Sequence, residues 1–131
     1  PMELREKKLQ VAINGNVTYE GDLPWSVEAV ENILKNCMEH TPNGGTITIK
    51  VKDTPIYTEL LITDTGPGID PEDLPHLFER FYKGKNSSTG NVGIGLALAR
   101  MIITSQNGTI KAENGKNGGA VFTLRFYKCT I

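Results

Sequence analysis

Asp64-Thr65-Gly66-Pro67-Gly68-Ile69 closely follows the apolar run Leu60-Leu61-Ile62. An Asn-rich amphipathic segment at residues 32–36 precedes this stretch, and a second glycine cluster at residues 90–96 follows it. A single glycine pair would indicate only a turn. An acidic residue with two glycines, a helix with paired asparagines and a helix that begins with glycines, in that order, together indicate a nucleotide site.

The bulk composition is that of a globular protein. The chain has 131 residues, 38% hydrophobic and 22% charged, so we expect a single domain, residues 1–131, with a substantial core. The formal net charge of −1 gives no basic field that would favour nucleic acid. We see no membrane-spanning run and no signal peptide, and we expect a cytoplasmic domain without direct membrane contact. Residues 1–8 are expected to be linker or artificial junction residues.

The two cysteines, Cys37 and Cys129, match no metal-binding or redox spacing. Cys37 falls among apolar residues of a helical pattern, which predicts a buried thiol. Both cysteines are expected to be reduced.

The first half of the chain predicts two strands, a helix and a hairpin. Residues 9–13 alternate as a strand would, and residues 17–19 can return as a second strand. Ser26 is a plausible N-cap of a helix that ends near His40. The apolar positions expected on one face of this helix are Val27, Val30, Ile33, Leu34, Cys37 and Met38.

The second half of the chain completes a sheet. Residues 46–51 and 57–63 are expected to form an antiparallel hairpin, and a short helical turn follows Asp70, with Leu74, Leu77, Phe78 and Phe81 on its apolar side. A helix over residues 93–105, with Leu96, Ala99, Ile102 and Ile103 inward, then precedes strands at residues 109–112 and 120–126. The predicted fold is α+β, a two-layer sandwich of a mixed, mainly antiparallel sheet with helices packed on one face.

The asparagines Asn32 and Asn36 are spaced one helical turn apart, so both amides lie on one side of the helix. An amide oxygen is a hard neutral ligand that suits Mg²⁺, which also uses water and substrate phosphates. In isolation, however, the pair is more simply two polar residues on a solvated flank.

The loop at Asp64 has groups that could bind the base of a nucleotide. A carboxylate at a strand end can accept a hydrogen bond from an exocyclic amine such as that of adenine, and Gly66 and Gly68 permit close approach of the backbone. The bland alternative is an ordinary turn. Gly93-Ile94-Gly95 opens the later helix, where unpaired N–H groups can hold phosphate, although this is no Walker motif.

Lys83 and Lys85 flank the polar stretch at residues 83–92. A lysine there could reach a terminal phosphate as a point charge, and a solvated surface lysine is an equally good interpretation. His40 could stack on a base, although a histidine at a helix end is more often simply a favourable charge.

Four motifs together resemble the catalytic, ATP-binding domain of sensor histidine kinases, within the superfamily of gyrase, the Hsp90 chaperones and MutL. Residues 31–42 resemble its N box and residues 64–69 its first glycine box. Residues 77–82 resemble its F box and residues 90–98 its second glycine box. The resemblance extends over residues 9–126 and implies the Bergerat ATP-binding fold.

The resemblance also implies roles for individual residues toward Mg-ATP. Asn36 would coordinate Mg²⁺ beside Asn32, and Asp64 would hold the adenine amino group. Lys83 would lie near the phosphates, and residues 83–92 would be the ATP lid, with Phe78 and Phe81 at its base. The remaining residues expected to line the nucleotide are His40, Gly66, Gly68, Ile69, Gly93, Ile94, Gly95 and Leu96.

The resemblance favours phosphoryl transfer over hydrolysis. Hydrolysing relatives carry a glutamate as general base one turn before the Mg²⁺ asparagine, and that position here is Asn32, which cannot take a proton at neutral pH. Transfer relies mostly on positioning and charge stabilisation. Asn36 and Lys83 are the expected catalytic residues of a protein-histidine kinase.

The phosphoacceptor histidine of that family lies in a motif that neither His40 nor His76 matches. The expected partners are therefore a separate dimerisation and phosphoacceptor helical domain of the same kinase and, downstream, a response regulator. Two alternatives stay open, a degenerate non-catalytic binding module and a serine-protein kinase of the anti-sigma type. Two departures from the family motifs support the non-catalytic module: Glu39 stands where many members have a lysine, and Asn91 stands where they usually have a glycine.

Overall fold

The computed structural model describes residues 8–14, 23–80 and 94–128. The elements, in chain order, are β1 (Lys8–Asn14), α1 (Leu23–His40), β2 (Thr46–Asp53), β3 (Tyr57–Asp64), a short 3₁₀ helix (Leu74–His76), α2 (Ile94–Ser105), β4 (Gly108–Asn114) and β5 (Ala120–Tyr127). The predicted strand at 17–19 and the predicted lid at 83–92 lie outside the described residues.

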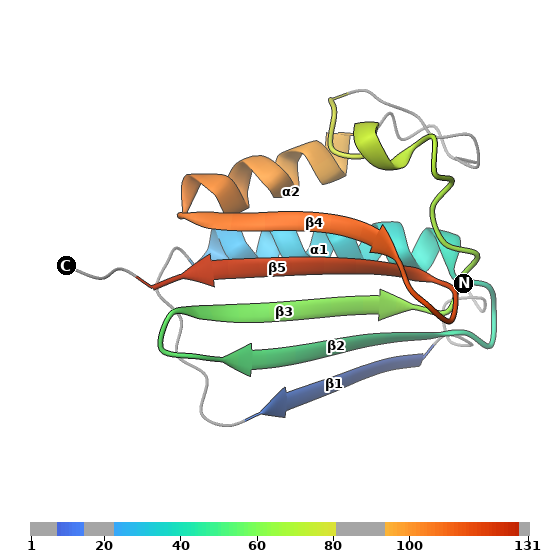
Figure 1. Ribbon diagram of the computed structural model, residues 1–131, viewed down its shortest axis with the longest axis horizontal. Helices are drawn as coiled ribbons and strands as arrows, with labels where there is room; N and C mark the ends of the chain where they lie inside the picture. Colours follow the sequence, from blue (N-terminus) through green and yellow to red (C-terminus); the bar gives the residue numbers. More distant parts are fainter. Residues whose placement is uncertain (1–7, 15–22, 81–93, 129–131) are drawn as a thin grey trace.

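The sheet has five strands in the order β1-β2-β3-β5-β4. β2 and β3 form the predicted antiparallel hairpin, β5 pairs antiparallel with both β3 and β4, and β1 joins β2 in parallel. Figure 1 shows α1 behind β4 and β5 and α2 above β4, and both helices bury apolar residues in one core. The predicted α+β sandwich with a mixed, mainly antiparallel sheet is confirmed.

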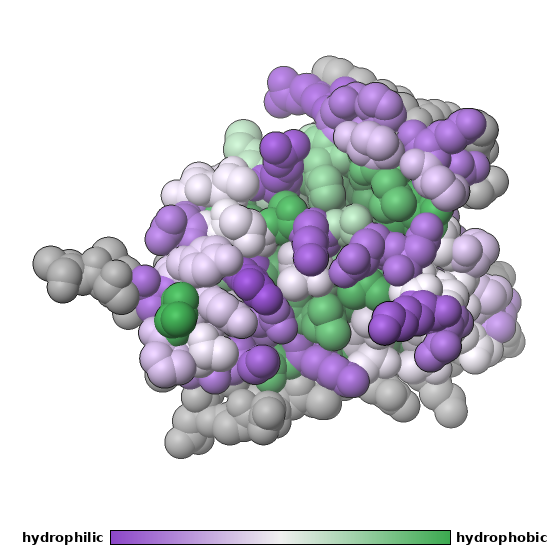
Figure 2. All heavy atoms as spheres, in the orientation of Figure 1, coloured by the Kyte–Doolittle hydropathy of each residue, from purple (hydrophilic) through white to green (hydrophobic). Residues whose placement is uncertain are grey.

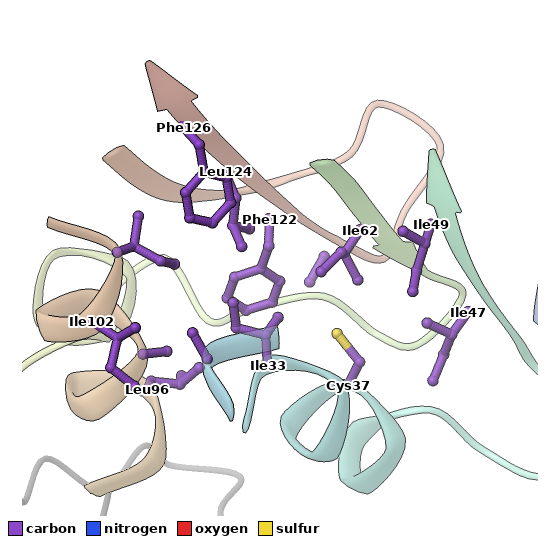
Figure 3. Packing of buried hydrophobic residues seen from close by; sticks show 14 residues of the cluster. Ile33, Cys37, Ile47, Ile49, Ile62, Leu96, Ile102, Phe122, Leu124 and Phe126 are labelled. Carbon is purple, nitrogen blue, oxygen red and sulfur yellow. The ribbon is translucent and has the colours of Figure 1, made fainter. Parts of the chain in front are cut away.

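The core lies between this sheet and the two helices. α1 contributes Ala29, Ile33 and Cys37, which are fully buried and spaced one helical turn apart. Figure 3 shows the Ile33 and Cys37 side chains reaching toward the sheet, near Phe122 and Ile62. The predicted inward residues of α2, namely Leu96, Ala99, Ile102 and Ile103, are all buried. Burial of this apolar face therefore fixes how α1 and α2 are turned on the sheet.

The start of α1 differs from the prediction in two ways. The helix begins at Leu23, so Ser26 lies inside it and is not the N-cap. Pro24 suits the first turn because the N–H that it lacks would have no partner there, which lets the helix begin earlier. Ser26 is buried instead, and its hydroxyl accepts a hydrogen bond from Gln106 Nε2 at 3.1 Å.

The predicted apolar face of α1 was wrong at Val27, whose side chain is 47% exposed. The buried stripe runs through Ala29, Ile33 and Cys37, and Val27 lies two residues before its first member, about 160° away around the helix. The burial of an apolar residue at the edge of a helical pattern therefore cannot be predicted from the pattern alone, because it depends on the surface against which the helix packs.

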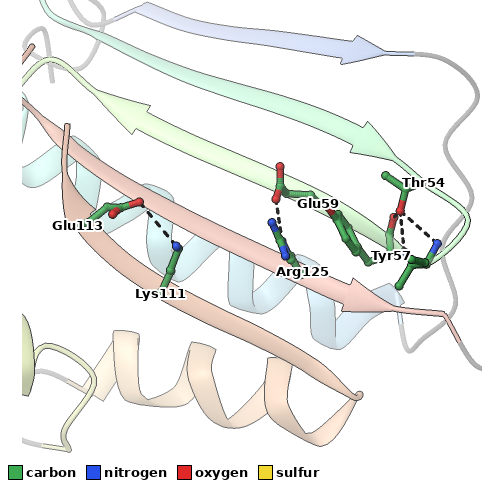
Figure 4. Close-up of polar contacts among 7 residues, drawn as sticks. Thr54, Tyr57, Glu59, Lys111, Glu113 and Arg125 are labelled. Atoms are coloured by element: carbon green, nitrogen blue, oxygen red, sulfur yellow. Dashed lines mark hydrogen bonds and ion pairs between the residues drawn. The ribbon is translucent and has the colours of Figure 1, made fainter. Parts of the chain in front are cut away.

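The opposite face of the sheet carries polar side chains. Arg125 on β5 donates to Glu59 Oε1 on β3 at 2.8 Å, and its guanidinium lies 4.4 Å from the centre of the Tyr57 ring. Figure 4 shows this ion pair across the two strands, and Figure 2 shows hydrophilic residues spread over the same face among smaller apolar areas. Alternation along the strands therefore buries one face and solvates the other, as in other antiparallel sheets.

The β4–β5 turn needs glycine for two separable reasons. Gly118 and Gly119 have φ values of 93° and 78°, which side chains rarely adopt. A Cβ at Gly118 would meet nothing within 4 Å, whereas a Cβ at Gly119 would overlap the carbonyl oxygen of Asp64. The turn therefore lies directly against the end of β3.

We predict that Gly119→Ala destabilises the protein more than Gly118→Ala. Gly118→Ala carries only backbone strain of about 1–2 kcal/mol, because nothing lies near its new side chain. Gly119→Ala carries the same kind of strain and adds a steric overlap with the carbonyl oxygen of Asp64. Urea unfolding of both variants measures the difference in the free energy of unfolding. Equal losses would mean that the turn does not pack on β3 in solution.

Candidate nucleotide site

Asp64 is the last residue of β3 and is 7% exposed. Its Oδ1 accepts two backbone hydrogen bonds, from Gly66 N at 2.9 Å and from Ala120 N at 3.1 Å. One carboxylate oxygen therefore ties the glycine loop to the first residue of β5. A buried carboxylate needs such donors, because burying it without them costs several kcal/mol.

The thiol of Cys37 lies beneath the same carboxylate. Burial raises the pKa of Cys37 strongly, and the charge of Asp64 and a side-chain hydrogen bond to it raise that pKa further. Cys37 is therefore a neutral thiol. A carboxylate has about four lone-pair sites, so these three contacts leave acceptor capacity on Asp64.

Asn32 on α1 faces the first turn of α2. A Cβ placed on Gly95 would lie 3.8 Å from the Asn32 Cβ, Cγ and Oδ1 atoms, so the two helices approach closely at this point. The Asn32 Nδ2 atom is buried and has no hydrogen-bond partner among the described residues. An unpaired buried donor costs about 1–3 kcal/mol and is uncommon, so this amide is a candidate for contact with a ligand.

The end of α1 supports the glycine loop. A Cβ at Gly66 would lie 2.5 Å from the carbonyl oxygen of His40, the last helical residue. Asn36 and the His40 side chain are both partly buried. The N-box helix and the first glycine box, which are separate in sequence, are therefore in direct contact.

The residues after the loop return to the core. Phe78 packs edge-on against Phe122, with ring centroids 6.4 Å apart and planes at 81°. Leu77 and Phe78 are partly buried against the core cluster, and Ile69 is too. The F-box segment is thus anchored as expected at Phe78, while Phe81 lies outside the described residues.

The second glycine box is only partly described. Lys83 and Gly93 lie outside the described residues, and of Ile94 only the helical backbone is described. Leu96 is 7% exposed within the apolar core, so its side chain packs inward and only its backbone can face a ligand. The structure therefore brings Gly95 against Asn32 in the middle of α1 and the loop at residues 64–69 against the end of α1 at His40. The expected lid lies outside the described residues.

The sequence comparison agrees with this geometry. The family model described as histidine kinase-, DNA gyrase B- and HSP90-like ATPase matches residues 21–129. The chain belongs to this family. The match includes the N-box helix, the loop at Asp64 and α2.

Several similar curated proteins are named as histidine kinases. YvrG of Bacillus subtilis is 35% identical over 115 residues, which cover 86% of this chain and 20% of that protein. BaeS of Escherichia coli is 32% identical over 123 residues, with 92% and 26% covered, and TrcS of Mycobacterium tuberculosis is 39% identical over 117 residues, with 83% and 23% covered. The chain spans about a quarter of the length of these relatives.

Solved histidine kinase structures share the fold. The mycobacterial sensor histidine kinase MprB superposes with a TM-score of 0.87 at 24% identity, over 99% of this chain and 89% of that one. The nucleotide-free catalytic domain of ThkA gives 0.82 at 26% identity, over 94% and 81%. Within the described residues, no helix has both the length and the apolarity to cross a membrane.

Three groups near the site were not identified as functional from the sequence. They are the Ala120 N–H, the Cys37 thiol beneath Asp64, and the Asn114 side chain, which contacts the backbone of Ile69. The sequence predicted that Cys37 is buried, but not that it lies beneath Asp64, and the glycine-rich stretch after Asn114 indicates a turn without indicating what the turn contacts.

We predict a pH-dependent stability contribution from Cys37. Because its pKa in the folded state lies above the ordinary 9.0, the unfolded chain loses its proton first as pH rises, and stability falls above about pH 9. The loss is up to about 1.4 kcal/mol per pH unit. Urea unfolding from pH 7 to 10 should show the wild type losing stability relative to Cys37→Ala. Parallel curves would contradict the assignment, because all other titrating groups are common to both proteins.

Proposed function

We propose that this chain is the catalytic domain of a sensor histidine kinase, which binds Mg-ATP and donates the γ-phosphoryl group to a histidine on a separate dimerisation and phosphoacceptor domain. The observation that carries the proposal is the buried Asp64 carboxylate, which is anchored by the backbone donors of Gly66 and Ala120. A second polar group, the buried Asn32 amide, lies against the start of α2. We place residues 1–131 in one cytoplasmic domain, with a response regulator downstream in the pathway.

The adenine end of the site is proposed at Asp64. Its remaining acceptor capacity suits the exocyclic amine of adenine, and its anchoring by Gly66 N and Ala120 N fixes where that acceptor points. The loop residues Gly68 and Ile69 would line the base, with His40 at the other side. Because the Asp64 acceptor is fixed in place, a base that carries a donor there should bind better than a base that carries an acceptor. The second base would leave buried polar atoms unpaired.

The phosphate end is proposed at the α1–α2 contact. The Asn32 Nδ2 is a donor without a partner among the described residues and suits a phosphate oxygen. The first turn of a helix such as α2 has N–H groups with no intrahelical partner and a dipole that favours phosphate. Asn36 would supply an amide oxygen to Mg²⁺, and Lys83, Gly93 and Ile94 would complete this end. Bound Mg²⁺ would neutralise phosphate charge.

Transfer is preferred over hydrolysis because of the residue at position 32. Asn32 lies one helical turn before Asn36, where a hydrolysing relative would need a carboxylate to activate water, and an amide accepts no proton near neutral pH. The acceptor side chain must then come from outside this site. Asn36 and Lys83 are the residues proposed to position and stabilise the transferring group.

We predict that Asp64→Asn lowers ADP affinity by about tenfold or more. The substituted amide oxygen can still accept from Gly66 N and Ala120 N, which preserves the loop, while its NH₂ group turns a donor toward the donor on adenine. Calorimetry with ADP and a non-hydrolysable ATP analogue measures the effect. Glu113→Gln, an equal charge change on exposed β4, is the matched control. Unchanged affinity in Asp64→Asn would overturn the adenine assignment.

We predict that the chain alone incorporates no acid-labile, base-stable label from γ-labelled ATP, because neither of its two histidines is proposed as the acceptor. Addition of the dimerisation and phosphoacceptor domain of its own kinase should produce such label on that domain. Label on this chain would refute the division of roles. Binding of ATP without transfer to that domain would instead favour the non-catalytic binding module.

A further inference from the structure

Asn114, the last residue of β4, contacts both backbone groups of Ile69 in the first glycine box. Its Oδ1 accepts from Ile69 N at 2.6 Å, and its Nδ2 donates to Ile69 O at 2.8 Å. One side-chain amide thus satisfies the N–H and C=O of one residue, as a neighbouring strand would. The two residues are 45 positions apart, so this is a tertiary contact between β4 and the loop.

The glycine at position 68 permits this contact. Gly68 has a φ of 87°, and a Cβ on it would lie 2.7 Å from Asn114 Oδ1. Any other residue there would be strained and would push the Asn114 amide away. The need for glycine at position 68 is therefore explained by the contact with Asn114, as well as by the approach of a ligand.

The contact is important because it joins the far end of the loop to the end of β4. Residues 63–66, 115–119 and 121 line a hollow of about 380 Å³ between the end of β3 and the β4–β5 turn. The segments are joined on one side by Ala120 N to Asp64 Oδ1 and on the other by Asn114 to Ile69. Residues 65–69 are therefore held at both ends, once at Asp64 and once at Ile69.

We propose that Asn114 is a positioning residue for the nucleotide, which acts through the backbone of Ile69 and needs no contact with the ligand itself. The inference rests on the proposed function, because it assigns to Asn114 the support of the loop that would line adenine. Without the amide, the loop keeps its contacts at Asp64, at Thr65 with β2 and at the carbonyl of His40. Both backbone groups of Ile69 lose their partner, so this far end of the loop must be ordered each time a nucleotide binds. That ordering lowers affinity.

Asn114 is exposed, so its removal should affect the loop and leave the fold intact. We predict that Asn114→Ala weakens ADP binding about fivefold to tenfold, with little change in melting temperature. Hydrogen exchange at the Ile69 amide should accelerate in this variant, because its acceptor is gone. Asn43→Ala, an equally exposed asparagine in the turn between α1 and β2, is the matched control and should change neither quantity.

The outcomes separate the two hypotheses. If the wild type binds no ADP, the proposed function fails, while the exchange rate of the Ile69 amide still tests whether Asn114 holds the loop. If the wild type binds ADP and Asn114→Ala binds it equally well, the positioning role is wrong. A loss of affinity that accompanies a matching fall in melting temperature would also overturn it, since Asn114 would then only stabilise the fold.

Discussion

The arrangement of this domain depends on the buried carboxylate of Asp64. A charge at this depth is tolerated only with good donors, and the two nearest are the backbone N–H groups of Gly66 and Ala120. One of them belongs to the loop that leaves β3 and the other to the strand that pairs with β3. The solvation requirement of one side chain therefore sets the path of the loop and the start of β5 at the same time. Whatever binds there meets an acceptor that is already fixed.

The second constraint is the rotation of α1. Its apolar stripe through Ala29, Ile33 and Cys37 must face the sheet, and this brings Cys37 under Asp64 and Asn32 against Gly95. The polar residues of the helix thus acquire their position from the apolar ones. This is why a motif that mixes both kinds of residue can specify a site. The unpaired Asn32 Nδ2 is a cost that the packing of α1 and α2 offsets.

Periodicity in the sequence was sufficient for the hairpin of β2 and β3, for the inward face of α2 and for the sandwich as a whole, because alternation and helical spacing report local burial. It was not sufficient at Ser26 and Val27, where the start of α1 and its partner surface decide the outcome. Contacts such as Ala120 with Asp64 join residues 56 positions apart, and one partner is a backbone group. No side-chain pattern encodes such a donor, so only the fold reveals it.

Backbone groups supply most of the observed contacts around the loop at residues 64–69. Those contacts use Gly66 N, Ala120 N, both polar groups of Ile69 and the close approach of Gly66 to the carbonyl of His40. Such groups are present whatever the side chain, provided that the backbone follows the same course. The sequence must therefore specify only a few positions, chiefly the carboxylate, the bridging amide and the glycines that admit them. A fold can keep this geometry while most other residues change, which fits relatives that are only 32–39% identical to this chain over the matched stretch.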